Sequence, residues 1–241
     1  MMQKSKPASQ HFMFATFISV CALAAFPVYA EAPGRGAIAQ FEKDYLTFII
    51  NHHYSALRIT ELAAGTDAQR DEPVNNPQEG TAPTPNFSAT PAKASSDEIK
   101  SMSRMANRMQ REEIVKAQRF LKDWYGVDHA PQLTPEGQQK IQVLTQAGAG
   151  PQFDRAFLEN FSNHHYRALA PSQDCRVKSD LKHAELKHYC EGIVESQTRS
   201  INDMRNQLCM RFNNCDFQPS DVTAAQHSSS RYQYPTNRKL V

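Results

Sequence analysis

The sequence lacks an excess of charge of either sign once its first 30 residues are set aside. Lys4 and Lys6 lie in that segment, so residues 31–241 carry 25 basic and 25 acidic side chains. A nucleic-acid-binding protein needs a basic surface that displaces counterions. We therefore expect no nucleic-acid partner.

Long apolar runs are also missing, except for one near the N-terminus. Residues 12–26 are apolar, but this run is shorter than the roughly 20 residues that cross a bilayer. Lys4 and Lys6 precede it, and Pro27-Val28-Tyr29-Ala30 ends in small residues typical of a cleavage site. We interpret residues 1–30 as a signal peptide, with an uncleaved anchor as the alternative. A bacterial periplasmic or secreted protein without a membrane span after cleavage is expected.

Cysteine is absent from residues 31–174, and four cysteines follow: Cys175, Cys190, Cys209 and Cys215. An even number in an exported chain suggests disulfides. Cys190 and Cys209 lie on one predicted helix, roughly 28 Å apart at about 1.5 Å per residue, and cannot pair within one chain. Cys175–Cys190 and Cys209–Cys215 are the natural pairs. Free thiols that serve a metal are the alternative, and the sequence does not settle the pairing.

An internal repeat organises the rest of the chain. Residues 41–57 align with residues 153–169, and both segments contain Asn-His-His-Tyr. Further along, Glu98-Ile99-Lys100 corresponds to Glu185-Leu186-Lys187. An ordered repeat of this kind predicts two similar structural units.

Apolar residues recur at helical spacing in both units. The pattern predicts an all-α fold, a four-helix bundle built from two duplicated helical hairpins within residues 31–217. Ser95 and Glu98 have capping-box spacing at the start of the second helix, and Pro171 is expected to end the third. The predicted helices cover about 41–62, 97–124, 153–170 and 180–212, with a short additional helix from Thr134-Pro135-Glu136 to about 145.

Two segments have few large apolar side chains. Residues 63–94 are rich in Gly, Pro, Asn, Thr and Ala, and residues 218–241 are rich in Ser, Gln and Thr. Segments of this composition bury too little apolar surface to offset their ordering entropy. We expect a disordered loop at about 63–94 and a disordered tail.

Several motifs together resemble domain-of-unknown-function family 305, a ferritin-like bundle of exported bacterial proteins. The resemblance implies periplasmic binding of copper or silver through Met and His side chains. Some Met positions of the family pattern differ here, since Ile49, Phe161 and Ala117 stand in their place. The motifs that carry the resemblance are His52-His53, Glu98-Ile99-Lys100, Gln110, Glu113-Ile114, Trp124-Tyr125-Gly126, Phe153-Asp154 and His164-His165.

The His pairs and a row of methionines suggest a metal site independently of that family. Antiparallel packing of the first two helices would place His52 level with Met105 and Met109. An imidazole that faces thioethers suits a soft ion such as Cu(I). We predict a protein that binds or buffers a copper-like ion, whose protein partner is unknown. The candidate ligands are His52, His53, His164, His165, Met105 and Met109.

Two other interpretations stay open. In a non-catalytic structural or partner-binding bundle, the histidines would be core residues hydrogen-bonded to Gln110, Gln197 or Asn163, or capped by Tyr54 and Tyr166. A ferritin-like oxidase would need Glu-x-x-His pairs. No acidic residue lies three positions before any of these histidines, so we expect no enzyme.

Overall fold

The predicted helices form in a computed structural model of the chain, which describes residues 34–67 and 81–220. Within these residues the regular secondary structure is entirely α-helical, which confirms the all-α prediction. The helices are α1 (Ala37–Ala64), α2 (Asp97–Tyr125), α3 (Pro135–Gln146), α4 (Pro151–Val177) and α5 (Ala184–Phe212).

Some of the predicted segments lie outside the described residues. They are the signal peptide at residues 1–30, residues 68–80 of the loop and residues 221–241 of the tail. Across residues 34–67 and 81–220, none of the helices combines the length and apolar character needed to cross a membrane.

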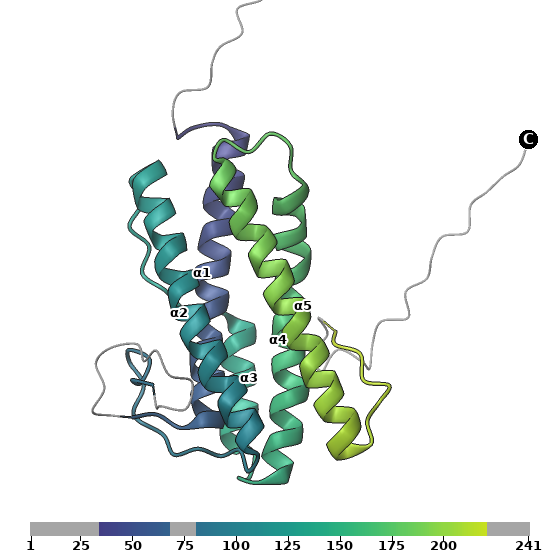
Figure 1. Ribbon diagram of the computed structural model, residues 1–241. Coiled ribbons are helices and arrows are strands. Elements are labelled where there is room, and N and C mark those ends of the chain that lie inside the picture. Colours follow the sequence, from purple (N-terminus) through teal and green to yellow (C-terminus); the bar gives the residue numbers. More distant parts are fainter. Residues whose placement is uncertain (1–33, 68–80, 221–241) are drawn as a thin grey trace, which may run out of the picture. The chain divides into compact units, whose positions relative to one another are not determined.

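The four long helices pack in two pairs, α1 along α2 and α4 along α5 (Figure 1). The pairs meet through α1 and α4, and α3 lies against both of these helices. By contrast, the backbones of α2 and α5 lie farther apart, and side chains such as Tyr189, whose hydroxyl donates to the Glu113 carbonyl, connect them.

The helix α2 starts at Asp97 as predicted, but its N-cap lies one residue later than the sequence predicted. Ser96 is the N-cap, and its hydroxyl accepts a hydrogen bond from the Ile99 backbone N–H at 3.3 Å. The predicted cap, Ser95, instead donates its hydroxyl to Oδ2 of Asp154 at 2.6 Å. Because the Asp154 carboxylate is buried, it needs donors, and Ser95 supplies them from both its hydroxyl and its backbone N–H.

The prediction that Pro171 ends its helix is wrong, because α4 continues through Pro171 to Val177. Proline inside a helix removes one backbone hydrogen bond. The turn that follows is anchored on both sides. The hydroxyls of Ser172 and Tyr45 lie 3.0 Å apart in a buried hydrogen bond, and Cys175 is bonded to Cys190 of α5. These contacts hold the last turn of α4 in place despite the missing hydrogen bond.

Both expected disulfides are confirmed. Cys175 pairs with Cys190, and Cys209 pairs with Cys215. All four cysteines that follow the predicted signal peptide are therefore oxidised, and the free-thiol alternative does not hold.

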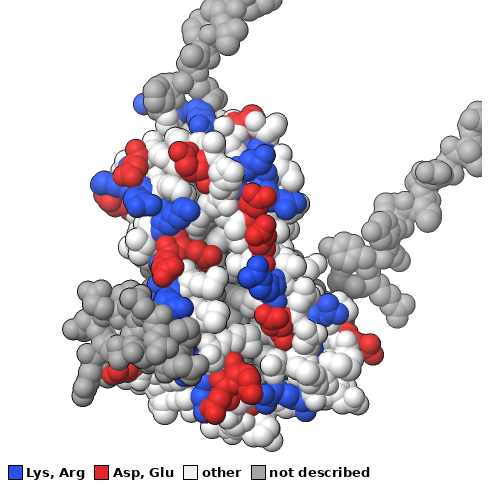
Figure 2. Space-filling model, viewed as in Figure 1, with Lys and Arg blue, Asp and Glu red and all other residues white. Residues whose placement is uncertain are grey.

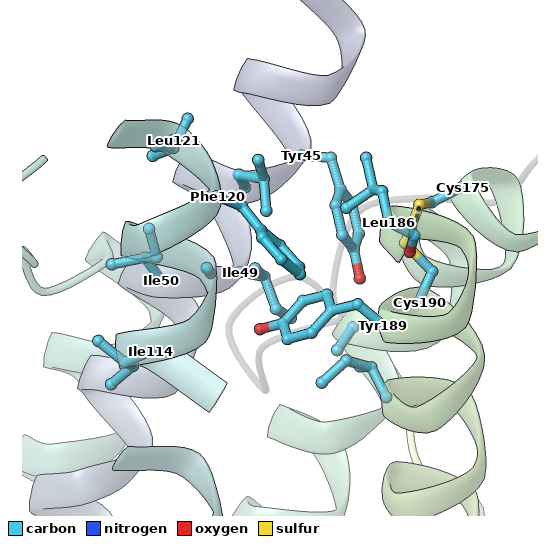
Figure 3. Close-up of a cluster of buried hydrophobic side chains, with 14 of the residues drawn as sticks. Tyr45, Ile49, Ile50, Ile114, Phe120, Leu121, Cys175, Leu186, Tyr189 and Cys190 are labelled. Atoms are coloured by element: carbon cyan, nitrogen blue, oxygen red, sulfur yellow. Dashed lines mark hydrogen bonds between the residues drawn. A yellow bond between two sulfur atoms is a disulfide. The ribbon is translucent and has the colours of Figure 1, made fainter. Parts of the chain in front are cut away.

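Apolar side chains form two clusters. One, shown in Figure 3, includes Tyr45, Ile49, Phe120 and Tyr189 and has the Cys175–Cys190 disulfide at its edge. The other lies around the N-terminal half of α4 and includes Phe153, Phe157, Phe161 and Met204. Along α4, His164 and His165 fall between the residues of the two clusters, so the histidines form a polar layer inside the bundle.

Part of the segment expected to be a disordered loop is held in place. Glu61 is buried in α1, and its Oε1 accepts hydrogen bonds from the Thr84 backbone N–H at 2.6 Å and from the Thr84 hydroxyl. The Tyr54 hydroxyl donates to the Pro85 carbonyl at 2.9 Å, and Arg111 donates to the Ala82 carbonyl at 2.7 Å. A buried carboxylate requires such partners, which composition alone does not indicate.

Candidate functional site

Both His pairs point into the bundle. His53 and His164 are fully buried, and His52 and His165 are each 2% exposed. The two repeated Asn-His-His-Tyr segments bring equivalent rings together. The rings of His52 and His164 stack at the contact between α1 and α4, with their centroids 3.8 Å apart.

Both ring nitrogens of His164 face an oxygen. Nδ1 lies 3.2 Å from Oε2 of Glu136, and Nε2 lies 3.2 Å from the backbone carbonyl oxygen of His52. A neutral imidazole carries only one N–H, so only one of these contacts is a hydrogen bond when the ring is neutral. Nε2 of His52 has no hydrogen-bond partner among the described residues.

The first turn of α3 brings Glu136 to this place. Thr134 caps the helix by accepting a hydrogen bond from the Gly137 backbone N–H at 2.9 Å, and Pro135 occupies the first turn. Gly137 lies against Ser55 of α1, where a Cβ atom would overlap the serine side chain. This close approach sets the carboxylate beside the stacked rings. His52, Glu136 and His164 each offer one ligand atom, and these atoms lie within 4.8 Å of one another.

Burial governs the charge of the histidines. It lowers the pKa of His52 and that of His165 well below the usual value, and it also lowers the pKa of His164. Burial acts in the opposite direction on Glu136. The hydrogen bond and charge of His164, together with the charge of Lys140, nevertheless lower the pKa of Glu136 to about 2. The site therefore combines an ionised carboxylate with imidazoles that resist protonation.

A cavity of about 140 Å³ lies between α2 and α5, with His165 of α4 in its wall. Charged side chains of both signs follow these two helices, and the surface between them is hollowed and mostly uncharged (Figure 2). Met105 is 44% exposed and Met109 is 39% exposed. Three methionines and one histidine contribute to the wall, namely Met102, Met105, Met109 and His165.

His165, which lines this cavity, has one ring nitrogen without a hydrogen-bond partner among the described residues. Its Nε2 lies 3.4 Å from Nε2 of Gln110, whereas its Nδ1 has no hydrogen-bond partner within residues 34–67 and 81–220. Nε2 of His53 lies 2.9 Å from Oε2 of Glu113, which also lines the cavity, but not in the alignment of a hydrogen bond. Buried polar atoms normally have partners, so these nitrogens are available as ligands.

Most of the partners expected for purely structural histidines are engaged elsewhere. The Tyr54 hydroxyl donates to the Pro85 carbonyl, Tyr166 is exposed, and Asn163 accepts from the Ser220 backbone N–H at 2.9 Å. Only Gln110 approaches one of the rings, and Oε1 of Gln197 is itself without a partner in the described part of the chain.

The structure gives the four predicted histidine ligands different neighbours. His52 and His164 stack on each other, His53 faces Glu113, and His165 lines the methionine cavity. Met105 and Met109, which the sequence placed level with His52, line a cavity together with His165, and His52 is not among the residues of its wall. Across this cavity the methionines of α2 lie opposite residues of α5 such as Gln197.

Sequence reasoning missed Glu136 as a site residue. In the sequence Glu136 is only an acidic residue near the start of a helix, which is a common and stabilising position. Glu136 has no fixed spacing to either His pair, and only the packing of α3 against α1 and α4 brings it to them. Met102 of α2, three positions before Met105, also contributes to the cavity wall.

Solved structures with a similar fold are known. This chain resembles a structure described as CopM in the Ag-bound form, with a TM-score of 0.50, 18% identity, and coverage of 71% of this chain and 97% of that chain. It also resembles CopM in the Cu(II)-bound form, with a TM-score of 0.50, 19% identity, and coverage of 69% and 94%. At these identities the likeness shows the fold alone. A comparison with curated protein sequences finds no match.

The match to a family model agrees with the motifs in the sequence. Residues 88–208 match the model described as Domain of unknown function (DUF305). This range covers about half of the chain and includes α2, α3 and α4 and most of α5. The chain belongs to the DUF305 family.

Proposed function

We propose that this chain is an exported, non-catalytic metal-handling protein that binds a soft ion such as Cu(I) at the cavity between α2 and α5. The observation that carries the proposal is the unpartnered Nδ1 of buried His165, which lines the same cavity as Met102, Met105 and Met109. Thioether sulfur and neutral imidazole are ligands that Cu(I) accepts. Burial lowers the pKa of His165, so its ring stays neutral and available for binding at neutral pH.

Exposure of the cavity supports a role in capture and release. Met105 and Met109 are partly exposed, so an ion from solution can reach the thioethers without unfolding of the bundle. His165 lies at the inner wall, where it would complete the ligand set. The structures with a similar fold hold silver and copper(II), which makes Ag(I) a suitable probe because it resembles Cu(I) and does not change oxidation state in air.

The sequence features of export are consistent with this role. The predicted signal peptide directs the chain to the periplasm or beyond the cell, and both disulfides require an oxidising compartment. A protein placed there would meet metal ions before they reach the cytoplasm.

Ag(I) binding by purified residues 31–241 tests the proposal. Isothermal titration calorimetry and bound-metal analysis of the wild type should show tight binding that the Met105→Leu/Met109→Leu double variant weakens at least tenfold. Met210→Leu is the matched control, because Met210 is 73% exposed and lies outside the cavity. Circular dichroism should show unchanged helix content in all three proteins.

His165→Gln extends the test to the imidazole ligand and should also weaken binding. The proposal is wrong if the wild type binds no stoichiometric Ag(I). It is equally wrong if the double variant binds Ag(I) as tightly as the wild type and Met210→Leu do.

A further inference from the structure

We propose that His52, Glu136 and His164 form a second metal site, separate from the methionine cavity, which takes a borderline divalent cation such as Zn²⁺. The three residues come from α1, α3 and α4, and their ligand atoms lie within 4.8 Å of one another. Two imidazoles and a carboxylate are a common ligand set for zinc. The cluster contains no sulfur, so the metal ion that it prefers differs from the one preferred by a site rich in thioethers.

The surroundings of His164 match those of a metal-binding histidine. Such a ring usually donates its other N–H to a backbone carbonyl or a carboxylate, which fixes the tautomer. Nε2 of His164 lies 3.2 Å from the His52 carbonyl oxygen and can donate to it. In that tautomer Nδ1 presents a lone pair toward Oε2 of Glu136 at 3.2 Å, in place of the hydrogen bond that the other tautomer donates to this carboxylate. A cation shared by Nδ1 and this carboxylate would turn a repulsive contact into an attractive one.

His52 contributes the third ligand atom. Its Nε2 is buried and has no hydrogen-bond partner within the described ranges. An unpartnered nitrogen in this position costs free energy in the metal-free protein. Binding of a cation would satisfy it.

The two oxygens of Glu136 serve different partners. Oε1 lies 3.2 Å from Nζ of Lys140, whereas Oε2 lies 3.2 Å from Nδ1 of His164. Lys140 therefore can keep its ion pair while Oε2 binds the cation. The Glu136 side chain is 10% exposed, so the carboxylate is not completely sealed from solvent.

The stacked rings must move when the ion binds. Their planes are 2° from parallel, and ring nitrogens direct their lone pairs within the ring plane. Two parallel rings cannot both direct a lone pair at one ion, so at least one ring has to turn about its Cβ–Cγ bond. Loss of the stack is therefore a signature of binding at this site and not at the cavity.

Zn²⁺ titration of purified residues 31–241 tests the inference. Calorimetry should give one Zn²⁺ per chain for the wild type. Removal of an outer-shell partner typically costs 10–100-fold in metal affinity, so loss of a ligand in Glu136→Gln should weaken binding at least tenfold. Glu159→Gln is the matched control, because Glu159 is paired with Arg155 on the surface of α4. Met105→Leu/Met109→Leu should bind Zn²⁺ like the wild type, which separates this site from the proposed Ag(I) site.

A second measurement uses the wild type alone, so it does not depend on whether a variant folds. In ¹⁵N-labelled wild type, Zn²⁺ should shift the ring resonances of His52 and His164 more than those of exposed His188. The inference is overturned if the wild type binds no Zn²⁺, if Glu136→Gln binds it as tightly as Glu159→Gln, or if these two rings do not respond.

Discussion

The rings of His52 and His164 stack although the two residues are 112 positions apart in the chain. They occupy equivalent places in the two repeated segments, and their contact lies where α1 meets α4. Burial, followed by the charge of His164, lowers the pKa of His52. Neutral rings can stack without electrostatic repulsion, so the contact between the helix pairs depends on the same protonation state that a metal ligand needs.

Gly137→Ala should destabilise the protein by about 1–3 kcal/mol, the usual cost of overpacking. The added Cβ would overlap Ser55 and push α3 away from α1. Urea unfolding measures the effect. Gly192→Ala is the control, because no atom lies near its Cβ position in α5, and this change should stabilise the helix by up to about 1 kcal/mol. Equal effects of the two substitutions would contradict the close approach of α3.

Removal of the Cys175–Cys190 disulfide by a double change to serine should cost about 3 kcal/mol, as expected for a loop of this length. This bond also holds the end of α4 in the apolar core. The Cys209–Cys215 pair closes a shorter loop at the end of α5, and its removal should cost about 2 kcal/mol. Chemical denaturation of both double variants measures which loss of stability is larger. A larger loss for the Cys209–Cys215 variant would contradict the central role of the Cys175–Cys190 bond.

Pro171→Ala should stabilise α4 by about 1–2 kcal/mol. Alanine restores a backbone donor inside the helix, and this gain exceeds the cost of a more flexible unfolded chain, which is below about 1 kcal/mol. Thermal unfolding followed by circular dichroism measures the change. A loss of stability would show that the proline ring itself is required by its neighbours.

Alkaline pH should destabilise the fold. Burial raises the pKa of Tyr45 and that of Tyr189 far above the usual value of about 10. Above pH 10 the unfolded chain therefore loses protons that the folded chain retains, and the free energy of unfolding falls as pH rises. The stabilisation is fully present below pH 10. Urea denaturation between pH 8 and pH 11 should show a steeper loss for the wild type than for Tyr45→Phe.

Binding of Ag(I) to the folded chain alone should raise the free energy of unfolding by about 2.7 kcal/mol at a free concentration of 100 times its Kd. Differential scanning fluorimetry measures this stabilisation as an increase in the Tm. The Met105→Leu/Met109→Leu variant should show a smaller shift at the same Ag(I) concentration, whereas Met210→Leu should match the wild type. The same shift in both variants would argue for binding outside the cavity.

The sequence predicted the helices well because their apolar residues recur at helical spacing and their caps are local. The start of α3 followed from Thr134-Pro135, and the disulfide partners followed from short separations. The predicted helix end at Pro171 was wrong because the local effect of the proline is outweighed by tertiary contacts of Ser172 and Cys175. The fixed position of Thr84 depends in the same way on the buried Glu61 carboxylate, which has no signature in composition.

The candidate site was predicted only in part. Repetition identified the His pairs, and helical periodicity placed His52 and His164 inside the bundle. Spacing could not show which neighbouring helix the face of Met105 meets, because a small rotation of α2 decides it. The position of Glu136 could not be predicted for another reason. Glu136 lies on a helix between the repeats, and only the packing of that helix brings it to the histidines.

The exposure of Met105 and Met109 also leaves both thioethers open to peroxide. Oxidation to the sulfoxide replaces a soft, polarisable sulfur donor with a polar oxygen. A protein that captures a soft ion with such side chains would lose that capacity under oxidative stress and recover it only when a sulfoxide reductase restores the methionines.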